Sequence, residues 1–123
     1  MNPDEPLRTK NLGEEGPAPM EDTLAGYAWL PRMIDKARAS RAGTLGQYFR
    51  YPCPIDQEAL ARLGLDSEEF AEVADRATTA KDVLESLAAH GARSAQEAAF
   101  DPIELNRRLH ERPLDSSEVG GGS

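Results

Sequence analysis

Cys53 is the strongest candidate for a nucleophile, because the deprotonated form of a cysteine is an effective attacking group. It is the only cysteine of 123 residues and stands between Pro52 and Pro54. A predicted helix with Asp56 as its N-cap begins just after it. The helix dipole favours a thiolate there, whereas the Asp56 carboxylate opposes one. No histidine is near in sequence, so a plain buried thiol is the other interpretation.

The segment before Cys53 has a net positive charge. From Arg32 to Arg50, five basic residues accompany one acidic residue, a net charge of +4, whereas residues 56–90 carry −6. The two segments either pack side by side and compensate each other, or the first forms a basic patch for an anionic ligand or an acidic partner surface. The candidate ligand-binding cations are Arg32, Lys36 and Arg38.

Asp35 lies three residues from both Arg32 and Arg38, so a helix would place the three charges close together. Such a triplet forms an ion-pair ladder worth about 0.2–0.5 kcal/mol per pair when it faces solvent. If it faces a cavity, it orients an arginine toward a carboxylate or phosphate. Asp35 is therefore also a candidate catalytic group.

Aromatic residues flank the same basic segment. Five of the seven in the chain are Tyr27, Trp29, Tyr48, Phe49 and Tyr51. With the arginines they would form a cavity wall suited to an anionic or planar ligand, or they supply the bulk of a small core. We expect Trp29 and Phe49 in the core. Tyr48 and Tyr51 are candidate ligand-binding residues, because a tyrosine hydroxyl needs a polar partner, and Tyr48 is also a candidate catalytic group.

Other common catalytic and metal-binding motifs are missing from the sequence. It has no HExxH, CxxC or GxSxG motif, no Walker-type glycine loop and no dinucleotide fingerprint. His90 and His110 are far apart, and each lies near a predicted helix end, where a solvated position is expected. The sequence therefore predicts no metal site and no cofactor.

Helix start and stop signals show how these residues are positioned. Pro31 at a first helical position and Gly43 as a stop predict a helix over residues 30–42. Later helices are predicted to start at the N-caps Asp56, Asp66, Thr78 or Thr79, Ser94 and Asp101. Their predicted ends are Gly64, Gly91 and, before Pro113, about Glu111.

The pattern predicts a mainly α fold, a small bundle of about five to six short helices. No segment alternates in the manner of a strand over any length. The best strand candidate is QYFRY, residues 47–51, which is either a connector or part of a hairpin with Thr44 and Leu45. We therefore expect at most a minimal strand or hairpin near residues 44–51.

A single domain over residues 23–112 is expected between two tails. Residues 1–22 contain four prolines, two glycines and six acidic residues, which bury too little apolar surface to offset the entropy of ordering. We expect this tail to be disordered or laid loosely over the domain. Residues 113–123 are expected to be a flexible tail, whose final GGGS is either an engineered linker or native.

Composition excludes several classes of function. A net charge of −8 argues against binding to nucleic acid or to anionic lipid. The apolar runs are far shorter than the roughly 20 residues needed to cross a bilayer. The N-terminus lacks the features of a signal peptide, and one cysteine suits a reducing compartment. The sequence thus predicts an acidic cytoplasmic protein with no nucleic-acid or membrane partner.

Four motifs between residues 30 and 70 carry a resemblance to a known family. They are LPRMIDKARA at 30–39, AGTLG at 42–46 followed by Tyr48, CPID at 53–56 and LGLD at 63–66. In these the chain resembles bacterial proteins catalogued as domain of unknown function 5069. The resemblance implies a small, mostly helical cytoplasmic protein with residues 30–56 as its signature, and no established substrate, cofactor or catalytic residue. Family members often carry tryptophans in the later helices, whereas this chain has none there.

Two functions stay open at this point. The first is a non-enzymatic binding or interaction protein that engages an anionic small molecule or a protein partner through residues 30–56. The second is a small enzyme acting on an anionic small molecule, with Arg32, Lys36 and Arg38 as substrate clamps. Its chemical group would be Tyr48, Asp35 or Cys53. The sequence leaves the oligomeric state open.

Overall fold

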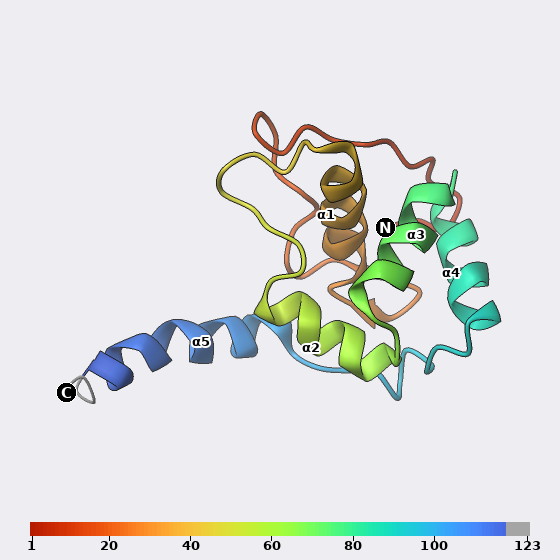
Figure 1. Cartoon of the computed structure of the whole chain (residues 1–123). Helices are drawn as coiled ribbons and strands as arrows, with labels where there is room; N and C mark the ends of the chain where they lie inside the picture. The colour runs from red at the N-terminus through yellow and green to blue at the C-terminus, as the bar shows by residue number, and fades with distance from the viewer. Residues whose placement is uncertain (118–123) are drawn as a thin grey trace.

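The computed structural model describes residues 1–117, with side chains described for residues 1–110. Within that range the fold is mainly α, as predicted, with five helices and one two-stranded hairpin (Figure 1). The elements are β1 (Thr23–Leu24), β2 (Tyr27–Ala28), α1 (Leu30–Ala42), α2 (Pro54–Leu63), α3 (Ser67–Arg76), α4 (Ala80–Ala89) and α5 (Pro102–Ser117). None of the described helices is long and apolar enough to cross a membrane.

The bounds of α1 are those that its sequence signals predict. Pro31 lies in the first turn, where its missing N–H removes no bond because those amides have no partner within the helix. Gly43 ends the helix at φ 75°, a left-handed conformation that suits glycine. Trp29 precedes the helix as its N-cap, also left-handed at φ 71°, and makes no side-chain capping bond.

The core forms where α1 packs against α3, with α2 and α4 closing its other sides (Figure 1). α1 contributes Leu30, Met33, Ile34 and Ala37 to the hydrophobic core. The other helices contribute Leu60, Leu63, Phe70, Val73, Val83 and Leu87 to the same cluster. In each helix these apolar residues recur at the helical spacing found in the sequence, so they lie on one face. Burial of that face in the core stabilises the helix.

α3 and α4 each begin with a capping box at a predicted N-cap. The Asp66 carboxylate accepts the Glu69 N–H at 2.8 Å, and the Glu69 carboxylate accepts the Asp66 N–H at 3.0 Å. Thr79 is the N-cap of α4. The box between Ser94 and Glu97 forms as well, but residues 95–98 make only turns. A capping box fixes one turn, and a longer helix needs further residues that pack.

The minimal strand content is also as predicted, but its position is different. The antiparallel pair is β1 with β2, in which Thr23 faces Ala28 and Leu24 faces Tyr27. Residues 44–51 form turns and a connector instead. Gly26, at φ 85°, lies in the two-residue turn of the hairpin, where a positive φ matches the twist of the strands.

Residues 1–22 are an ordered part of the domain, which differs from the expected disordered or loosely laid tail. This segment runs across α1 and reaches the start of α4 (Figure 1). The Leu7 N–H donates to the Thr78 carbonyl at 2.9 Å, and the Leu12 N–H donates to the Thr44 carbonyl at 2.7 Å. Leu12 is 2% exposed. These backbone partners are distant in sequence, so composition alone did not indicate them.

The connection between α1 and α2 is attached to this N-terminal segment. The Thr44 hydroxyl donates to the Lys10 carbonyl at 2.8 Å. Gly46, at φ 75°, lies against Gly13, and a Cβ at Gly46 would come within 2.8 Å of the Gly13 Cα. Only glycine satisfies both the conformation and the close approach. This contact holds one end of the loop that carries Tyr48.

α5 projects away from the other helices (Figure 1). The Asp101 carboxylate accepts the N–H groups of Ile103 at 3.1 Å and Glu104 at 3.0 Å, as expected of an N-cap. The helix was predicted to end near residue 111, but it continues through Pro113 to Ser117. The first five residues of the predicted C-terminal tail are therefore helical. Residues 118–123, including GGGS, lie outside the described residues.

Candidate functional site

The N-terminus of α2 is built around Cys53. Cys53 is the N-cap, Pro54 is the first helical residue and Asp56 is the third, so the prediction of Asp56 as the N-cap is corrected. The Asp56 N–H donates to the Cys53 sulfur at 3.5 Å, and the Asp56 carboxylate accepts the Cys53 N–H at 2.9 Å. Pro54 was the sequence signal for this start, since proline favours the first helical position.

Lys36 and Asp56 form a buried ion pair beneath this helix end. Their Nζ and Oδ2 atoms are 2.7 Å apart, and the side chains are 4% and 0% exposed. Trp29 Nε1 donates to the other Asp56 oxygen at 2.7 Å. Lys36 Nζ also donates to the Cys53 sulfur at 3.2 Å. The ammonium and carboxylate thus neutralise each other in the core, and each keeps further polar contacts, as a buried pair requires.

Arg32 lies one turn before Lys36 on the same side of α1. Its guanidinium carbon is 5.4 Å from the centre of the Trp29 ring and 5.6 Å from that of Phe49, which are cation–π distances. Its Nη1 donates to the Ala18 carbonyl at 3.1 Å. Its buried Nε has no hydrogen-bond partner among the described residues. Burial lowers the pKa of Arg32 from its usual value, and the charge of Asp56 partly opposes that shift.

These groups line a cavity of about 460 Å³, which we call the Arg32 cavity. It contains four of the predicted site residues: Arg32, Lys36, Tyr48 and Cys53. The other lining residues are Met20, Trp29, Phe49, Arg50, Pro54, Ile55, Asn106, Leu109 and His110. Tyr48 is 80% exposed. The structure therefore brings together two of the three predicted cations, the thiol and one of the two predicted tyrosines.

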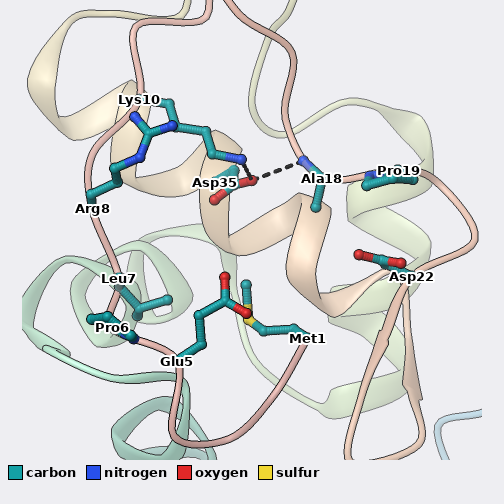
Figure 2. Close-up of a pocket in the computed structure, with 10 residues that line it drawn as sticks. All are labelled: Met1, Glu5, Pro6, Leu7, Arg8, Lys10, Ala18, Pro19, Asp22 and Asp35. Atoms are coloured by element: carbon teal, nitrogen blue, oxygen red, sulfur yellow. Dashed lines mark hydrogen bonds and ion pairs between the residues drawn. The ribbon is translucent and has the colours of Figure 1, made fainter.

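Asp35 lies in a different cavity, so it does not share a site with Cys53. That second cavity, of about 560 Å³, lies between α1 and the N-terminal segment (Figure 2). One Asp35 oxygen accepts from Lys10 Nζ and from the Ala18 N–H, both at 2.8 Å, and the other points into the cavity (Figure 2). The ion-pair partner of Asp35 in the described chain is Lys10, so the predicted triplet with Arg32 and Arg38 does not form.

Arg38 and Tyr51 contact the two ends of α3 instead of the Arg32 cavity. Arg38 Nη1 donates to the carbonyls of Ala74 at 2.6 Å and Ala77 at 3.0 Å, at the C-terminal end of α3. The Tyr51 hydroxyl donates to the Ser67 carbonyl at 2.7 Å, at its N-terminal end. Burial raises the pKa of Tyr51 above its usual value. Both side chains therefore tie α1 and the α1–α2 connection to α3.

α5 supplies part of the cavity that sequence reasoning missed. Asn106, Leu109 and His110 line it. His110 is exposed, as predicted, and its Nδ1 contacts the Asn106 carbonyl at 2.8 Å. Nothing local in the sequence indicates that α5 lines the same cavity as the loop at Tyr48. Among the described residues, no three side chains of the His, Cys, Asp and Glu types come together as metal ligands.

Comparison with known proteins finds a family but no activity. A family model described as Domain of unknown function (DUF5069) matches residues 14–119, most of the chain. The matched range includes every residue that lines the Arg32 cavity. No curated protein matches the chain. The family's description assigns no activity.

Proposed function

The chain belongs to this family of unknown function, and from that premise we propose that it is a small non-enzymatic binding protein. Its ligand is an anionic small molecule held in the Arg32 cavity. The proposal keeps the signature segment, residues 30–56, as the binding region and narrows it to the residues that share one cavity. It gives Arg38 and Tyr51 structural roles, because their polar atoms bond the backbone of α3.

The charge of the cavity wall carries this proposal. The chain has 22 acidic residues, and none of them is among the described residues that line the Arg32 cavity. Arg32, Lys36, Arg50 and His110 do line it. Asp56 neutralises Lys36 from below, so Arg32 and Arg50 leave the cavity with a net positive charge. A positive cavity in an acidic protein attracts and retains anions selectively.

Equilibrium dialysis against a small-molecule extract tests the proposal. We expect the wild-type protein to retain at least one anionic compound and the Arg32→Gln/Arg50→Gln variant to retain at least tenfold less of it, as measured by mass spectrometry. Two cations are removed from the cavity in that variant. The effect of about tenfold corresponds to about 1.4 kcal/mol, a typical contribution of hydrogen bonds to a charged group.

The matched control for dialysis is the Arg76→Gln/Lys81→Gln variant. It loses the same charge from exposed positions that do not line the cavity. It should retain the compound as the wild type does, and far-ultraviolet circular dichroism should show that both variants are folded. Equal retention by the Arg32→Gln/Arg50→Gln variant, or retention of neutral compounds alone, would contradict the proposal.

A second candidate function is a small enzyme that uses Cys53, and one observation favours it. The Cys53 sulfur lines the same cavity as Arg32 and Tyr48 and lies 3.2 Å from Lys36 Nζ. The arrangement needed for a substrate clamp beside a thiol is therefore present. Two features favour binding instead: Lys36 is already paired with Asp56, and the Asp56 carboxylate, in the first turn of the helix that Cys53 caps, opposes a thiolate.

The alkylation rate of Cys53 distinguishes the two candidates. We expect iodoacetamide to modify the folded protein at pH 7.5 no faster than it modifies the same chain unfolded in guanidinium chloride. The Lys36 ammonium beside the sulfur is already paired with Asp56, and the Asp56 carboxylate at the same helix end opposes a thiolate. Intact-mass spectrometry over time gives both rates from the single cysteine. A folded rate more than about tenfold higher would favour the enzyme.

As part of the same proposal, we place the protein in the cytoplasm of a bacterium. Its one cysteine is a free thiol, which suits a reducing compartment. The bacterial assignment follows from the resemblance of residues 30–70. Immunoblotting of fractionated cells should find the protein with the cytoplasmic markers, and recovery with an extracellular or membrane fraction would overturn this assignment.

A further inference from the structure

We infer that the anion bound in the Arg32 cavity is a carboxylate on a flat, apolar body, with one edge of the Arg32 guanidinium as its anchor. This inference rests on the proposed anion-binding function and names the chemical class of the ligand. It follows from three features of the cavity: the free edge of Arg32, the occupied donors of α2 and the apolar walls.

The Arg32 guanidinium is held in place and has one unused edge. Its central carbon lies over the rings of Trp29 and Phe49, and Nη1 is bonded to the Ala18 carbonyl. The hydrogen bonds of the described residues leave Nε and Nη2 without a partner. These two groups point the same way and form the planar fork that bonds both oxygens of a carboxylate. A buried unused donor is costly, so a ligand that fills it gains affinity.

The N-terminus of α2 is poorly suited to hold a phosphate, although it borders the cavity. Phosphate sites of this kind use the free N–H groups of the first helical turn. Here Pro54 has no N–H, and the N–H groups of Cys53 and Asp56 are bonded within the capping box. The Lys36 ammonium near this helix end is already paired with Asp56. A dianionic phosphate would thus find few free donors and no free cation at this helix end.

The remaining walls favour a flat, apolar ligand body. Met20, Ile55 and Leu109 supply aliphatic surface, and Phe49 and Tyr48 supply rings. Tyr48 is 80% exposed, so its ring is available to stack on a bound ligand. A volume of about 460 Å³ accommodates a molecule of small-metabolite size. A ligand with an apolar body and a single carboxylate would pack against these walls and bond to the Arg32 guanidinium.

Trp29 allows the inference to be tested directly, because it is the only tryptophan and lines the cavity. Its fluorescence is followed while phenylacetate, phenylacetamide, phenyl phosphate or inorganic phosphate is added to about 50 mM at constant ionic strength. Ligands of this size bind with dissociation constants in the millimolar range. We expect a saturable change with phenylacetate, and at least tenfold weaker binding of each of the other three compounds.

Two variants test the role of Arg32. Arg32→Lys keeps the charge but loses the planar fork, and Arg32→Gln loses both, so each should weaken phenylacetate binding at least tenfold. Arg76→Gln, on the exposed surface, should bind as the wild type does. Thermal melts by circular dichroism confirm that each variant is folded.

The outcomes separate this inference from the proposed function. Phenyl phosphate binding as tightly as phenylacetate, and depending on Arg32, would overturn the carboxylate class while leaving an anion-binding cavity. Equal binding of phenylacetamide would overturn both the anchor and the anion proposal, whereas equal phenylacetate binding by Arg32→Gln would overturn the anchor and leave the anion proposal standing. No saturable change with phenylacetate up to about 50 mM would overturn the carboxylate inference.

Discussion

Replacing Lys36 with methionine should lower the free energy of unfolding by about 3–5 kcal/mol, because it leaves Asp56 as an unpaired charge in the core. The two side chains are 4% and 0% exposed and their charged atoms are 2.7 Å apart. Small domains have a total stability of about 5–15 kcal/mol, so this variant should be only marginally folded. Urea denaturation followed by circular dichroism measures the loss.

The double variant Lys36→Met/Asp56→Asn identifies the cause of that loss. An asparagine at position 56 has no charge but keeps a carbonyl that can accept from Trp29 Nε1, a bond that is 2.7 Å long in the wild type. The double variant should therefore be more stable than Lys36→Met alone. A loss below about 1 kcal/mol for Lys36→Met, the value typical of an exposed pair, would contradict the buried pair.

Replacing Arg38 with methionine should lower the free energy of unfolding by about 2–3 kcal/mol and leave ligand binding unchanged. Its Nη1 bonds the carbonyls of Ala74 and Ala77, which belong to buried residues. Loss of a charged donor costs this much when buried carbonyls lose their partner. Urea denaturation measures the stability, and the Trp29 titration with phenylacetate measures the binding.

Arg76→Met is the matched control for the Arg38 variant. Arg76 lies on α3, is 80% exposed and pairs with Glu72 at the surface, so its replacement should change stability by less than about 0.5 kcal/mol. If Arg38→Met stayed folded but bound phenylacetate more than threefold more weakly, Arg38 would belong to the binding site after all. That result would support the role of ligand-binding cation that the sequence predicted for Arg38.

Local capping signals account for most of what the sequence predicted correctly about the fold. Pro31 and Gly43 bound α1, and the box from Asp66 to Glu69 opens α3. Each signal consists of residues within about one turn of each other, so the capping interaction forms independently of residues that are distant in sequence. The start of α2 was misplaced because a cysteine is an uncommon N-cap, and Asp56 was the stronger local candidate.

The features that sequence reasoning missed depend on distant parts of the chain. The N-terminal segment is ordered by backbone bonds such as that from Leu12 to Thr44, and backbone groups carry no residue-specific signal. The placement of α5 on the wall of the cavity that Tyr48 also lines is equally non-local. Ordering and docking of this kind depend on which surfaces meet after the helices pack, which a pattern along the chain does not encode.

Helix geometry explains which predicted site residues share the Arg32 cavity. Successive helical residues are about 100° apart, so Arg32 and Lys36 differ by only about 40° and face the same side of α1. Asp35 is turned about 60° from Arg32 in the opposite direction, and Arg38 about 120°. Asp35 therefore reaches the N-terminal segment, and Arg38 reaches α3. The cluster of charged residues in the sequence identified α1 as part of the site. The angular position of each residue around the helix determined which groups it contacts.

The contacts between the α1–α2 connection and the N-terminal segment limit where a shortened protein can begin. These contacts join Gly46 to Gly13 and Thr44 to Lys10. The match to the family begins at residue 14, and a fragment trimmed to that limit would lose Lys10 and Leu12. The loop at Tyr48 would then have lost its support, including the bond from the Leu12 N–H to the Thr44 carbonyl. The smallest fragment that preserves the binding loop therefore starts upstream of the family boundary, so purification tags are better placed beyond α5.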